Sequence, residues 1–458
     1  MPVIPRDDIW QGSGHGLQPP LERRPIGDYA GAMTRTILLA AALFLAVGAK
    51  RAPSPLDGIA ADYVRLTLEA GEREEGYVDA YYGPKDWADE AKAKPRDVAT
   101  LRRDAHALAE RLEAVKPATL NADDRIRRRF LAAQLKAAET RLAMMAGVTF
   151  AFADEAEGLF AVRPELKPLS AYDSILREID AAVPGEGPLW QRVDAWQDRF
   201  VVPADKLEPV MRAAIAECRA RTVAHIALPA QERFELELVT GKSWSGYNWY
   251  RGDAHSLIQV NTDLPVRIDR AVDLGCHEGY PGHHALNMLL ERNLARAKGW
   301  IEFTVYPLFS PQSFIAEGSA NAGIDLAFPG PERARFEAER LYPIAGLDPA
   351  GAAAYDRLLA LLHQLAGARA TIAAMYLDGK VDRATALDLI QEYQLVSRKR
   401  AEQSLSFTEN YRSYVINYGL GQDMVTADLA RAGANPKARW RRMEAIISQP
   451  TLPADLRP

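Results

Sequence analysis

Three of the eight histidines in this 458-residue chain lie close together, in the segment Cys-His-Glu-Gly-Tyr-Pro-Gly-His-His at residues 276–284. Neutral imidazoles and a carboxylate bind zinc at about 2 Å, and a catalytic zinc site keeps one position open for water. His277, His283 and the downstream Glu317 supply such a ligand set, with His284 as the alternative to His283. Glu278 follows the first histidine and could take a proton from that water. These residues predict a zinc-dependent hydrolase with one Zn²⁺ per chain.

The spacing of these histidines does not fit a regular helix. Four positions after His277 stands Pro281, which cannot bind a metal and removes a helical hydrogen bond. On a regular helix, six residues turn through about 600°, and seven residues place His284 about 10 Å along the axis. Pro281 and Gly282 must therefore open or widen the turn, which shortens the reach to His283. We predict His283 as the second ligand and His284 as a residue that supports it.

The third expected ligand is a glutamate downstream of the histidines. Glu317 lies in Ala-Glu-Gly-Ser-Ala, far enough along the chain for one helix to end and another to pack against it. The small residues Gly318, Ser319 and Ala320 would let those two helices approach closely. Asp325 could orient a ligand histidine, although an acid in such a place is more often simply solvated.

A peptide hydrolase also stabilises an oxyanion, usually with tyrosine, histidine or arginine beside the metal. The tyrosine-rich segment 411–422 offers three candidates. We rank Tyr418 first, because the glycine after it could leave its hydroxyl open to a cleft, and then the substrate-binding candidates Tyr414 and Arg412. The tyrosines also fall on one helical face, so aromatic packing explains them equally well. Asn261, in a predicted strand, is a weaker substrate-binding candidate.

The two motifs, His277-Glu-Gly-Tyr-Pro-Gly-His-His and Ala316-Glu-Gly, resemble the signatures of the bacterial domain-of-unknown-function 885 family. The resemblance runs over most of the chain and includes Val78-Asp-Ala-Tyr-Tyr-Gly-Pro84. It implies a largely helical, often exported, zincin-like peptidase of the gluzincin kind, with two histidines and a glutamate as zinc ligands. Many relatives continue the second motif with Trp-Ala, whereas Ser319-Ala320 follow here, which bears on the shape of the pocket and not on the ligand. The family's substrates are poorly defined, so the resemblance names none.

The elements that must position these residues are mainly helical. Helical periodicity before residue 230 predicts helices at Asp57–Glu74, Asp97–Val115, Ala122–Met145, Ser170–Val183 and Pro203–Ile226. A second group of predicted helices follows the strand region, at Ala271–Arg292, Pro311–Leu326, Ala350–Leu377, Arg383–Gln403 and Pro436–Ser448. Asn121 is the expected cap of the helix that begins at Ala122.

Between Arg233 and Ile268 the pattern changes to the alternation of strands. We therefore predict a mainly α, zincin-like, two-lobed metallopeptidase with a small antiparallel β-sheet beside the metal helix. Residues 50–230 form the expected helical N-terminal lobe and 231–458 the catalytic lobe. The sheet could hold an extended peptide by backbone hydrogen bonds, or it could be a structural hairpin.

The N-terminus predicts export. Met33-Thr-Arg-Thr precedes an apolar run, Ile37–Ala49, that ends in small residues, as a signal peptide does. The run is too short for a comfortable membrane span, so no stable span is expected once it is removed. We interpret residues 1–32 as a disordered extension or one upstream of the real start, 33–49 as the signal peptide, and the mature protein as periplasmic. The alternative is a genuine extension before a membrane anchor.

Composition limits the partners of this chain. The net charge is −5, and no basic stripe or aromatic-basic array is present, so a nucleic-acid surface is not expected. A peptide or small amide is the expected partner, and the sequence leaves the oligomeric state open. The two cysteines, Cys218 and Cys276, are expected to be buried apolar residues in a protein that relies on its core and not on disulfides.

Overall fold

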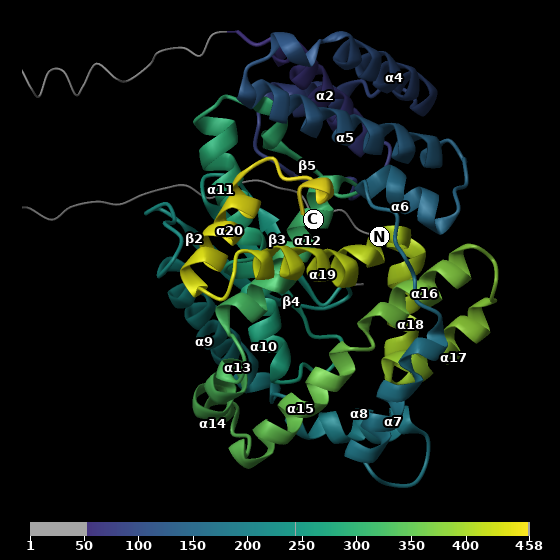
Figure 1. Cartoon of the computed structure of the whole chain (residues 1–458), viewed down its shortest axis with the longest axis vertical. Helices are drawn as coiled ribbons and strands as arrows, with labels where there is room; N and C mark the ends of the chain where they lie inside the picture. Colours follow the sequence, from purple (N-terminus) through teal and green to yellow (C-terminus); the bar gives the residue numbers. More distant parts are fainter. Residues whose placement is uncertain (1–52, 243, 457–458) are drawn as a thin grey trace, which may run out of the picture. The chain divides into compact units, whose positions relative to one another are not determined.

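The structure is a computed structural model that describes residues 53–242 and 244–456 (Figure 1). The predicted extension at 1–32 and the predicted signal peptide at 33–49 lie outside the described residues. From Pro53 onward the chain forms one compact unit, and its main hydrophobic cluster takes residues from Leu66 to Leu456. The division into lobes at 50–230 and 231–458 stays a prediction.

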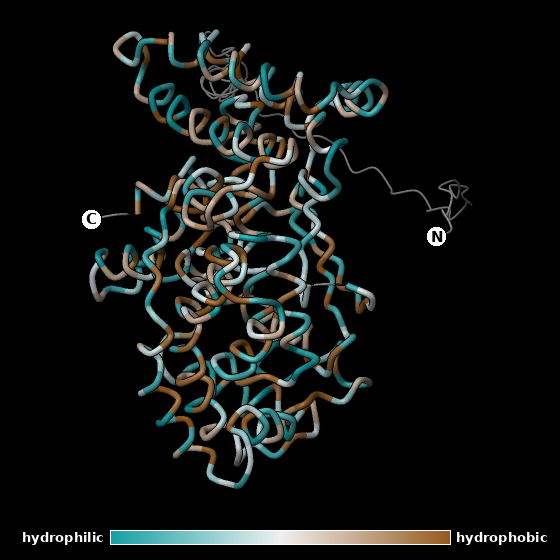
Figure 2. Tube along the Cα trace, turned by 90° about the vertical axis from the view of Figure 1, so that its right-hand side faces the viewer, coloured by the Kyte–Doolittle hydropathy of each residue, from teal (hydrophilic) through white to brown (hydrophobic). Residues whose placement is uncertain are grey.

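Most of the described chain is helical, as the sequence predicted. Before the central sheet lie α2 (Asp57–Gly71), α3 (Lys85–Ala93), α4 (Val98–Ala114), α5 (Ala122–Met145), α6 (Phe152–Phe160), α7 (Asp173–Ala182), α8 (Leu189–Gln197) and α9 (Ala204–Val223). After it lie α10 (Asp269–Leu274), α11 (His283–Leu290), α12 (Pro311–Ala327), α13 (Glu332–Phe336), α14 (Tyr342–Ala345), α15 (Ala352–His363), α16 (Ala366–Leu377), α17 (Arg383–Gln394), α18 (Arg398–Tyr411), α19 (Ile416–Arg431) and α20 (Pro436–Ser448). In Figure 2 the helical coils change between brown and teal along their turns, which is typical of helices with one buried side.

Capping side chains explain where three helices begin. Asp97, Asn121 and Ser310 each accept a hydrogen bond from the backbone N–H three positions later, at the starts of α4, α5 and α12. Such a bond satisfies one of the four N–H groups that a helix leaves free at its start. The cap predicted at Asn121 is therefore confirmed, and Ser310 fixes the start of the helix that carries Glu317.

Two long helices expected from the sequence are each divided in two. The predicted helix at 350–377 is broken between α15 and α16, and the one at 383–403 is broken after α17, where Leu395 adopts φ 52°. A left-handed residue ends a helix, and an apolar pattern continued on both sides does not reveal it. By length and composition alone, Pro349–Leu377 could cross a membrane. Leu358, Leu365 and Ile372 from this stretch are buried in a second hydrophobic cluster.

The predicted three-stranded sheet is present, and it is mixed. Strands β2 (Arg233–Val239), β3 (Gly246–Tyr250) and β4 (His255–Asn261) lie in the order β2-β4-β3. β3 and β4 are antiparallel as expected, whereas β2 is parallel to β4. Alternation along a strand identifies the strand but not the direction of its partner, so this pairing could not be read from the sequence. A second small sheet joins β1 (Val78–Tyr81) to β5 (Val305–Pro307) in antiparallel fashion.

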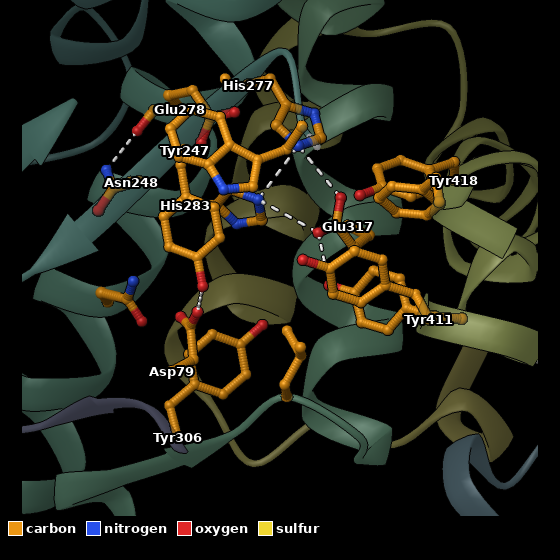
Figure 3. Close-up of a pocket in the computed structure, with 16 residues that line it drawn as sticks. Asp79, Tyr247, Asn248, His277, Glu278, His283, Tyr306, Glu317, Tyr411 and Tyr418 are labelled. Atoms are coloured by element: carbon orange, nitrogen blue, oxygen red, sulfur yellow. Dashed lines mark hydrogen bonds and ion pairs between the residues drawn. The ribbon is translucent and has the colours of Figure 1, made fainter. Parts of the chain in front are cut away.

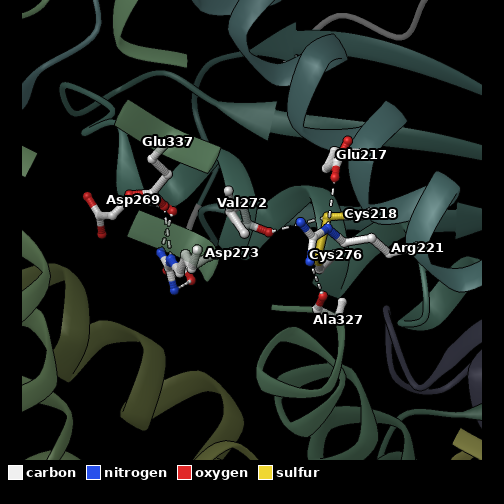
Figure 4. Close-up of a disulfide and its surroundings, with 10 residues drawn as sticks. Glu217, Cys218, Arg221, Asp269, Val272, Asp273, Cys276, Ala327 and Glu337 are labelled. Atoms are coloured by element: carbon white, nitrogen blue, oxygen red, sulfur yellow. Dashed lines mark hydrogen bonds and ion pairs between the residues drawn. A yellow bond between two sulfur atoms is a disulfide. The ribbon is translucent and has the colours of Figure 1, made fainter. Parts of the chain in front are cut away.

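A disulfide joins Cys218 in α9 to Cys276, which directly precedes His277 (Figure 4). Both cysteines are fully buried, as expected, but they are not free, so the expectation of a protein without disulfides was wrong. Their Cα atoms lie 5.3 Å apart although 58 positions separate them in the sequence. The packing of α9 against residues Gly275–Gly279 brings the two cysteines together. The spacing of the cysteines in the sequence does not predict that packing.

This disulfide is expected to make a large contribution to stability. Closing a loop of that length lowers the entropy of the unfolded chain and stabilises the fold by about 4 kcal/mol. Urea unfolding of the wild type should therefore shift to a lower midpoint in reductant. The double variant Cys218→Ser/Cys276→Ser should show that lower midpoint with and without reductant. Equal midpoints for the wild type and the double variant would contradict the expectation.

Candidate metal centre

Three side chains that the sequence singled out converge on one point (Figure 3). Nε2 of His277 and Nε2 of His283 lie 3.1 Å apart. The carboxylate oxygens of Glu317 lie 3.1 Å from His277 Nε2 and 3.6 Å from His283 Nε2. All three candidate ligand atoms lie within 4.8 Å of one another. The residues predicted as ligands are thus placed where one cation could touch all of them.

A widened turn brings the two histidines together, as the sequence predicted. Residues Gly275–Gly279 form a π-helix, the Tyr280–Pro281 peptide bond is cis, and α11 then starts at His283. The N–H of Gly282 donates to the carbonyl of Cys276 at 3.0 Å. A Cβ atom on Gly282 would lie only 1.8 Å from the carbonyl oxygen of His277. Only glycine fits there, because any side chain would force the turn apart.

His284 points away from this cluster. Its ring is fully buried, with Nδ1 2.7 Å from the hydroxyl of Ser256 and Nε2 3.4 Å from a carboxylate oxygen of Glu232. Glu232 also accepts hydrogen bonds from Tyr280 and Arg219. His284 is therefore absent from the group that could hold a metal, and it instead fastens α11 to the sheet beside its neighbour His283.

Helix α12 presents Glu317 to the two imidazoles. Its Oε1 accepts a hydrogen bond of 2.7 Å from the hydroxyl of Tyr414, whereas Oε2 is buried and accepts none from the described chain. Burial alone would raise the pKa of Glu317, but His283 and His277 outweigh it and hold the pKa well below its usual range. Glu317 is therefore an ionised carboxylate that faces the two histidines and could serve as a ligand.

The small residues after Glu317 serve a different contact from the expected one. A Cβ atom on Gly318 would lie 2.6 Å from the backbone of Gly421, so α12 and α19 touch backbone to backbone at this point. The turn that contains Pro281 instead approaches α12 at Gly323, where a Cβ atom would lie 2.7 Å from the ring of Pro281. The close approach of α12 to the turn at Pro281 therefore depends on Gly323, which was not among the small residues expected to allow it.

The orientation of His277 is set by a residue that sequence reasoning missed. Its Nδ1 lies 2.9 Å from Oδ1 of Asn321, whose amide nitrogen donates to the carbonyl of Tyr418 at 3.2 Å. Such a hydrogen bond fixes the tautomer that leaves Nε2 free for a metal. Asn321 stands four positions after Glu317, on the same helical face, which is the signal that could have found it. Asp325 instead accepts from Gln422 at 3.3 Å.

The second histidine is strongly affected by the surrounding acids. Burial lowers the pKa of His283, but Glu317, Glu278 and Asp79 outweigh burial and raise this pKa to about 9. Without a cation the ring therefore holds a proton at neutral pH, and binding a metal must release it. Nδ1 of His283 is buried and makes no hydrogen bond with the described chain.

The predicted general base, Glu278, faces the same pocket. It is 4% exposed, and its carboxylate makes no hydrogen bond or ion pair within the described residues. Burial raises the pKa of Glu278, and the imidazoles of His277 and His283 oppose the rise. Strand β3 lies directly against this side chain: a Cβ on Gly246 would be 3.0 Å from Oε1 of Glu278. Glu278 is thus a buried carboxylate without a hydrogen-bond partner among the described residues.

The remaining sequence candidates divide into two groups. Tyr418 and Tyr414 line the pocket, and the ring of Tyr418 stacks on His277 with centroids 6.3 Å apart. Arg412 instead donates to Glu155 at 2.7 Å, and Asn261 donates to the carbonyls of residues 242 and 244. Neither Arg412 nor Asn261 lines the pocket, so their contacts do not support the substrate-binding roles predicted for them.

The pocket has an empty volume of about 570 Å³, which includes the space at its opening to solvent. Sequence reasoning missed several of its residues, among them Asp79 on β1, Tyr247 and Asn248 on β3, and Tyr306 on β5. They come from three different strands, and the fold brings them together around one pocket (Figure 3). Asp79 does fall in the segment 78–84 that carried part of the family resemblance.

The donor set fits a divalent metal ion of the zinc type. Two imidazole nitrogens and one carboxylate are the ligands of many catalytic zinc sites, which leave a further position open. The unsatisfied Oε2 of Glu317 and the hydrogen bond from Asn321 to His277 are what such a site requires. His277, His283 and Glu317 could therefore hold the ion.

No family model and no curated protein matches this chain. Among solved structures it is similar to the putative lipoprotein from Colwellia psychrerythraea, with a TM-score of 0.50 and 16% identity over 77% of this chain. That match spans 65% of the other chain, less than two thirds of its length. The M32 carboxypeptidase from Deinococcus radiodurans R1 gives a TM-score of 0.35 and 14% identity over 85% of this chain and 89% of that one. The first likeness supports the fold, and membership of the domain-of-unknown-function 885 family stays a prediction.

Proposed function

We propose that this protein is a zinc-dependent peptidase. The observation that carries the proposal is the convergence of His277, His283 and Glu317, with the unpartnered carboxylate of Glu278 in the same pocket. A metal ligand set alone is also found in structural sites, which are closed by a fourth protein ligand. Here the described residues offer three ligands, and a pocket opens beside them.

A zinc ion at this position would supply Lewis acidity, because it acidifies a water molecule and polarises a carbonyl group. Glu278 would then accept a proton from water and return it to the leaving amine, a task that its raised pKa favours. Asn321 keeps His277 in the orientation that binds the ion, and Tyr414 keeps Glu317 in place. Tyr418, beside His277, is the candidate donor to the oxyanion.

Two observations support an exported, periplasmic protein. Disulfides persist in oxidising compartments and are rare in the bacterial cytosol, and this chain contains a buried one. The similar structure from Colwellia psychrerythraea is described as a putative lipoprotein, and lipoproteins are exported proteins. Both agree with the signal peptide predicted at residues 33–49.

Metal analysis followed by digestion of a peptide library tests the proposed function. The purified protein should contain about one zinc ion per chain. It should cleave peptides, lose this activity in a chelator, and regain it when zinc is restored. Tight zinc binding without any turnover would instead favour a non-catalytic periplasmic binding protein, and cleavage of esters or simple amides alone would favour a non-peptide hydrolase.

A further inference from the structure

The wall of the pocket has an unusual balance of charge. Of the described residues that line it, seven are tyrosine, tryptophan or phenylalanine, three are acids, and none is lysine or arginine. Two of the acids, Glu317 and Glu278, already have tasks in the proposed chemistry. Asp79 does not. With a divalent ion bound and all three acids ionised, the lining keeps one net negative charge.

Asp79 is aimed into the pocket by an irregularity in its strand. β1 pairs Val78 with Pro307 and Ala80 with Tyr306, so β1 advances two residues while β5 advances one. Asp79 is the extra residue at this bulge. Bulges are frequent beside active sites, where they redirect a side chain. In Figure 3 Asp79 lies beside Tyr247 and Tyr306, on the far side of His283 from Tyr418.

The contacts of Asp79 leave part of its carboxylate available. The hydroxyl of Tyr247 donates to Oδ1, and no hydrogen bond or ion pair within the described residues uses Oδ2. Burial raises the pKa of Asp79 to about 6, and Tyr247 and His283 oppose that rise. The amide oxygen of an asparagine could accept the same hydrogen bond from Tyr247. This bond alone therefore does not explain why a partly buried carboxylate stands at position 79.

We propose that Asp79 binds a cationic group of the substrate, an ammonium or guanidinium, close to the bond that is cleaved. The inference rests on the proposed function, because it assigns a substrate class to the same pocket. The cation can come from the amino terminus of a peptide or from a lysine or arginine side chain. The rings of Tyr247 and Tyr306 beside Asp79 suit such a group, since aromatic faces attract cations.

Two cations lie beside the aromatic wall of the pocket. Lys242 lies 5.9 Å from the ring of Trp244, and Arg369 lies 5.0 Å from the ring of Phe407 and 5.7 Å from that of Tyr418. Both contact rings of the wall without lining the pocket. The Arg369 contacts lie on the Tyr418 side of the pocket, away from Asp79 (Figure 3).

Four peptides of one sequence test the proposal with the zinc-loaded full chain. Their amino terminus is free or acetylated, and one internal position is lysine or norleucine. The wild type should cleave at least one cationic peptide with a kcat/KM about 10-fold to 100-fold above that of the acetylated norleucine peptide. The arm that carries the preference identifies the source of the cation. In Asp79→Asn the difference should disappear, and Asp79→Glu should restore part of it.

Asp89→Asn is the matched control, because Asp89 pairs with Lys85 on an exposed part of α3 and should keep the full preference. Zinc content and melting temperature are measured for every variant, so that a folding defect is separated from a loss of selectivity. Equal cleavage of all four peptides by the wild type overturns the inference and leaves the proposed function standing. If the zinc-loaded protein cleaves none of them, the proposed function fails. Calorimetry then decides the inference: binding that favours the cation and weakens in Asp79→Asn supports it, and equal binding overturns it.

Discussion

Glu278→Gln is expected to retain zinc and to lose peptide hydrolysis by a factor of about 10² to 10⁴, the usual contribution of a general base. The amide has nearly the shape of the carboxylate, so it fits against β3 at Gly246, where space is short. It cannot take a proton from water. Because Glu278 is not among the ligands that converge, the metal should stay. Initial rates on a cleaved peptide, together with zinc content, measure both halves of the result.

The control for this variant is Glu235→Gln, which removes an acid on β2 that pairs with His255 outside the pocket. It should keep the activity of the wild type. If Glu278→Gln cleaves peptides at the native rate while it holds zinc, Glu278 is not the base. If the variant loses its zinc as well, its carboxylate belongs to the ligand set, and the assignment of roles in the pocket changes.

His283→Ala and His284→Ala are expected to have opposite effects although the two residues are neighbours. His283→Ala removes a ligand, so zinc affinity should fall by at least about 100-fold, since even residues that only orient a ligand reach that factor. Hydrolysis should fall with it. His284→Ala should keep zinc and lose about 1–3 kcal/mol of stability, because Ser256 and Glu232 lose a buried partner.

Zinc titrations and urea unfolding of the two variants separate these effects. Each variant serves as the control for the other, because the same substitution is made one position apart on the same helix. Should His284→Ala lose the metal while His283→Ala retains it, the ligand assignment is inverted, and the alternative weighed from the sequence becomes the correct one.

The parts of the site that depend on local chemistry could be predicted from the sequence. Proline and glycine at 281–282 required a distorted turn, and that turn is present as a π-helix. The choice of His283 over His284 followed from the same geometry, and the structure brings His283 to the cluster. Helical periodicity and the cap at Asn121 gave most of the helices.

The parts that depend on distant segments could not be predicted. Asp79 reaches the pocket through a bulge in a sheet formed with residues more than two hundred positions away, and one strand pattern does not contain that information. The pairing of Cys218 with Cys276 and the parallel direction of β2 depend on packing in the same way. Arg412 was selected for its charge, yet its partner, Glu155, comes from α6.

The disulfide between Cys218 and Cys276 also bears on how the candidate metal site would be loaded with zinc. A free thiolate is itself a strong zinc ligand, and a reduced Cys276 would be the residue before His277 in the chain. Oxidation before an ion binds would remove this thiolate and leave the nitrogen and oxygen donors of the proposed site. Recombinant protein made in a reducing cytosol would meet zinc with sulfur still available, so secretion to an oxidising compartment is the sounder route to a correctly loaded preparation.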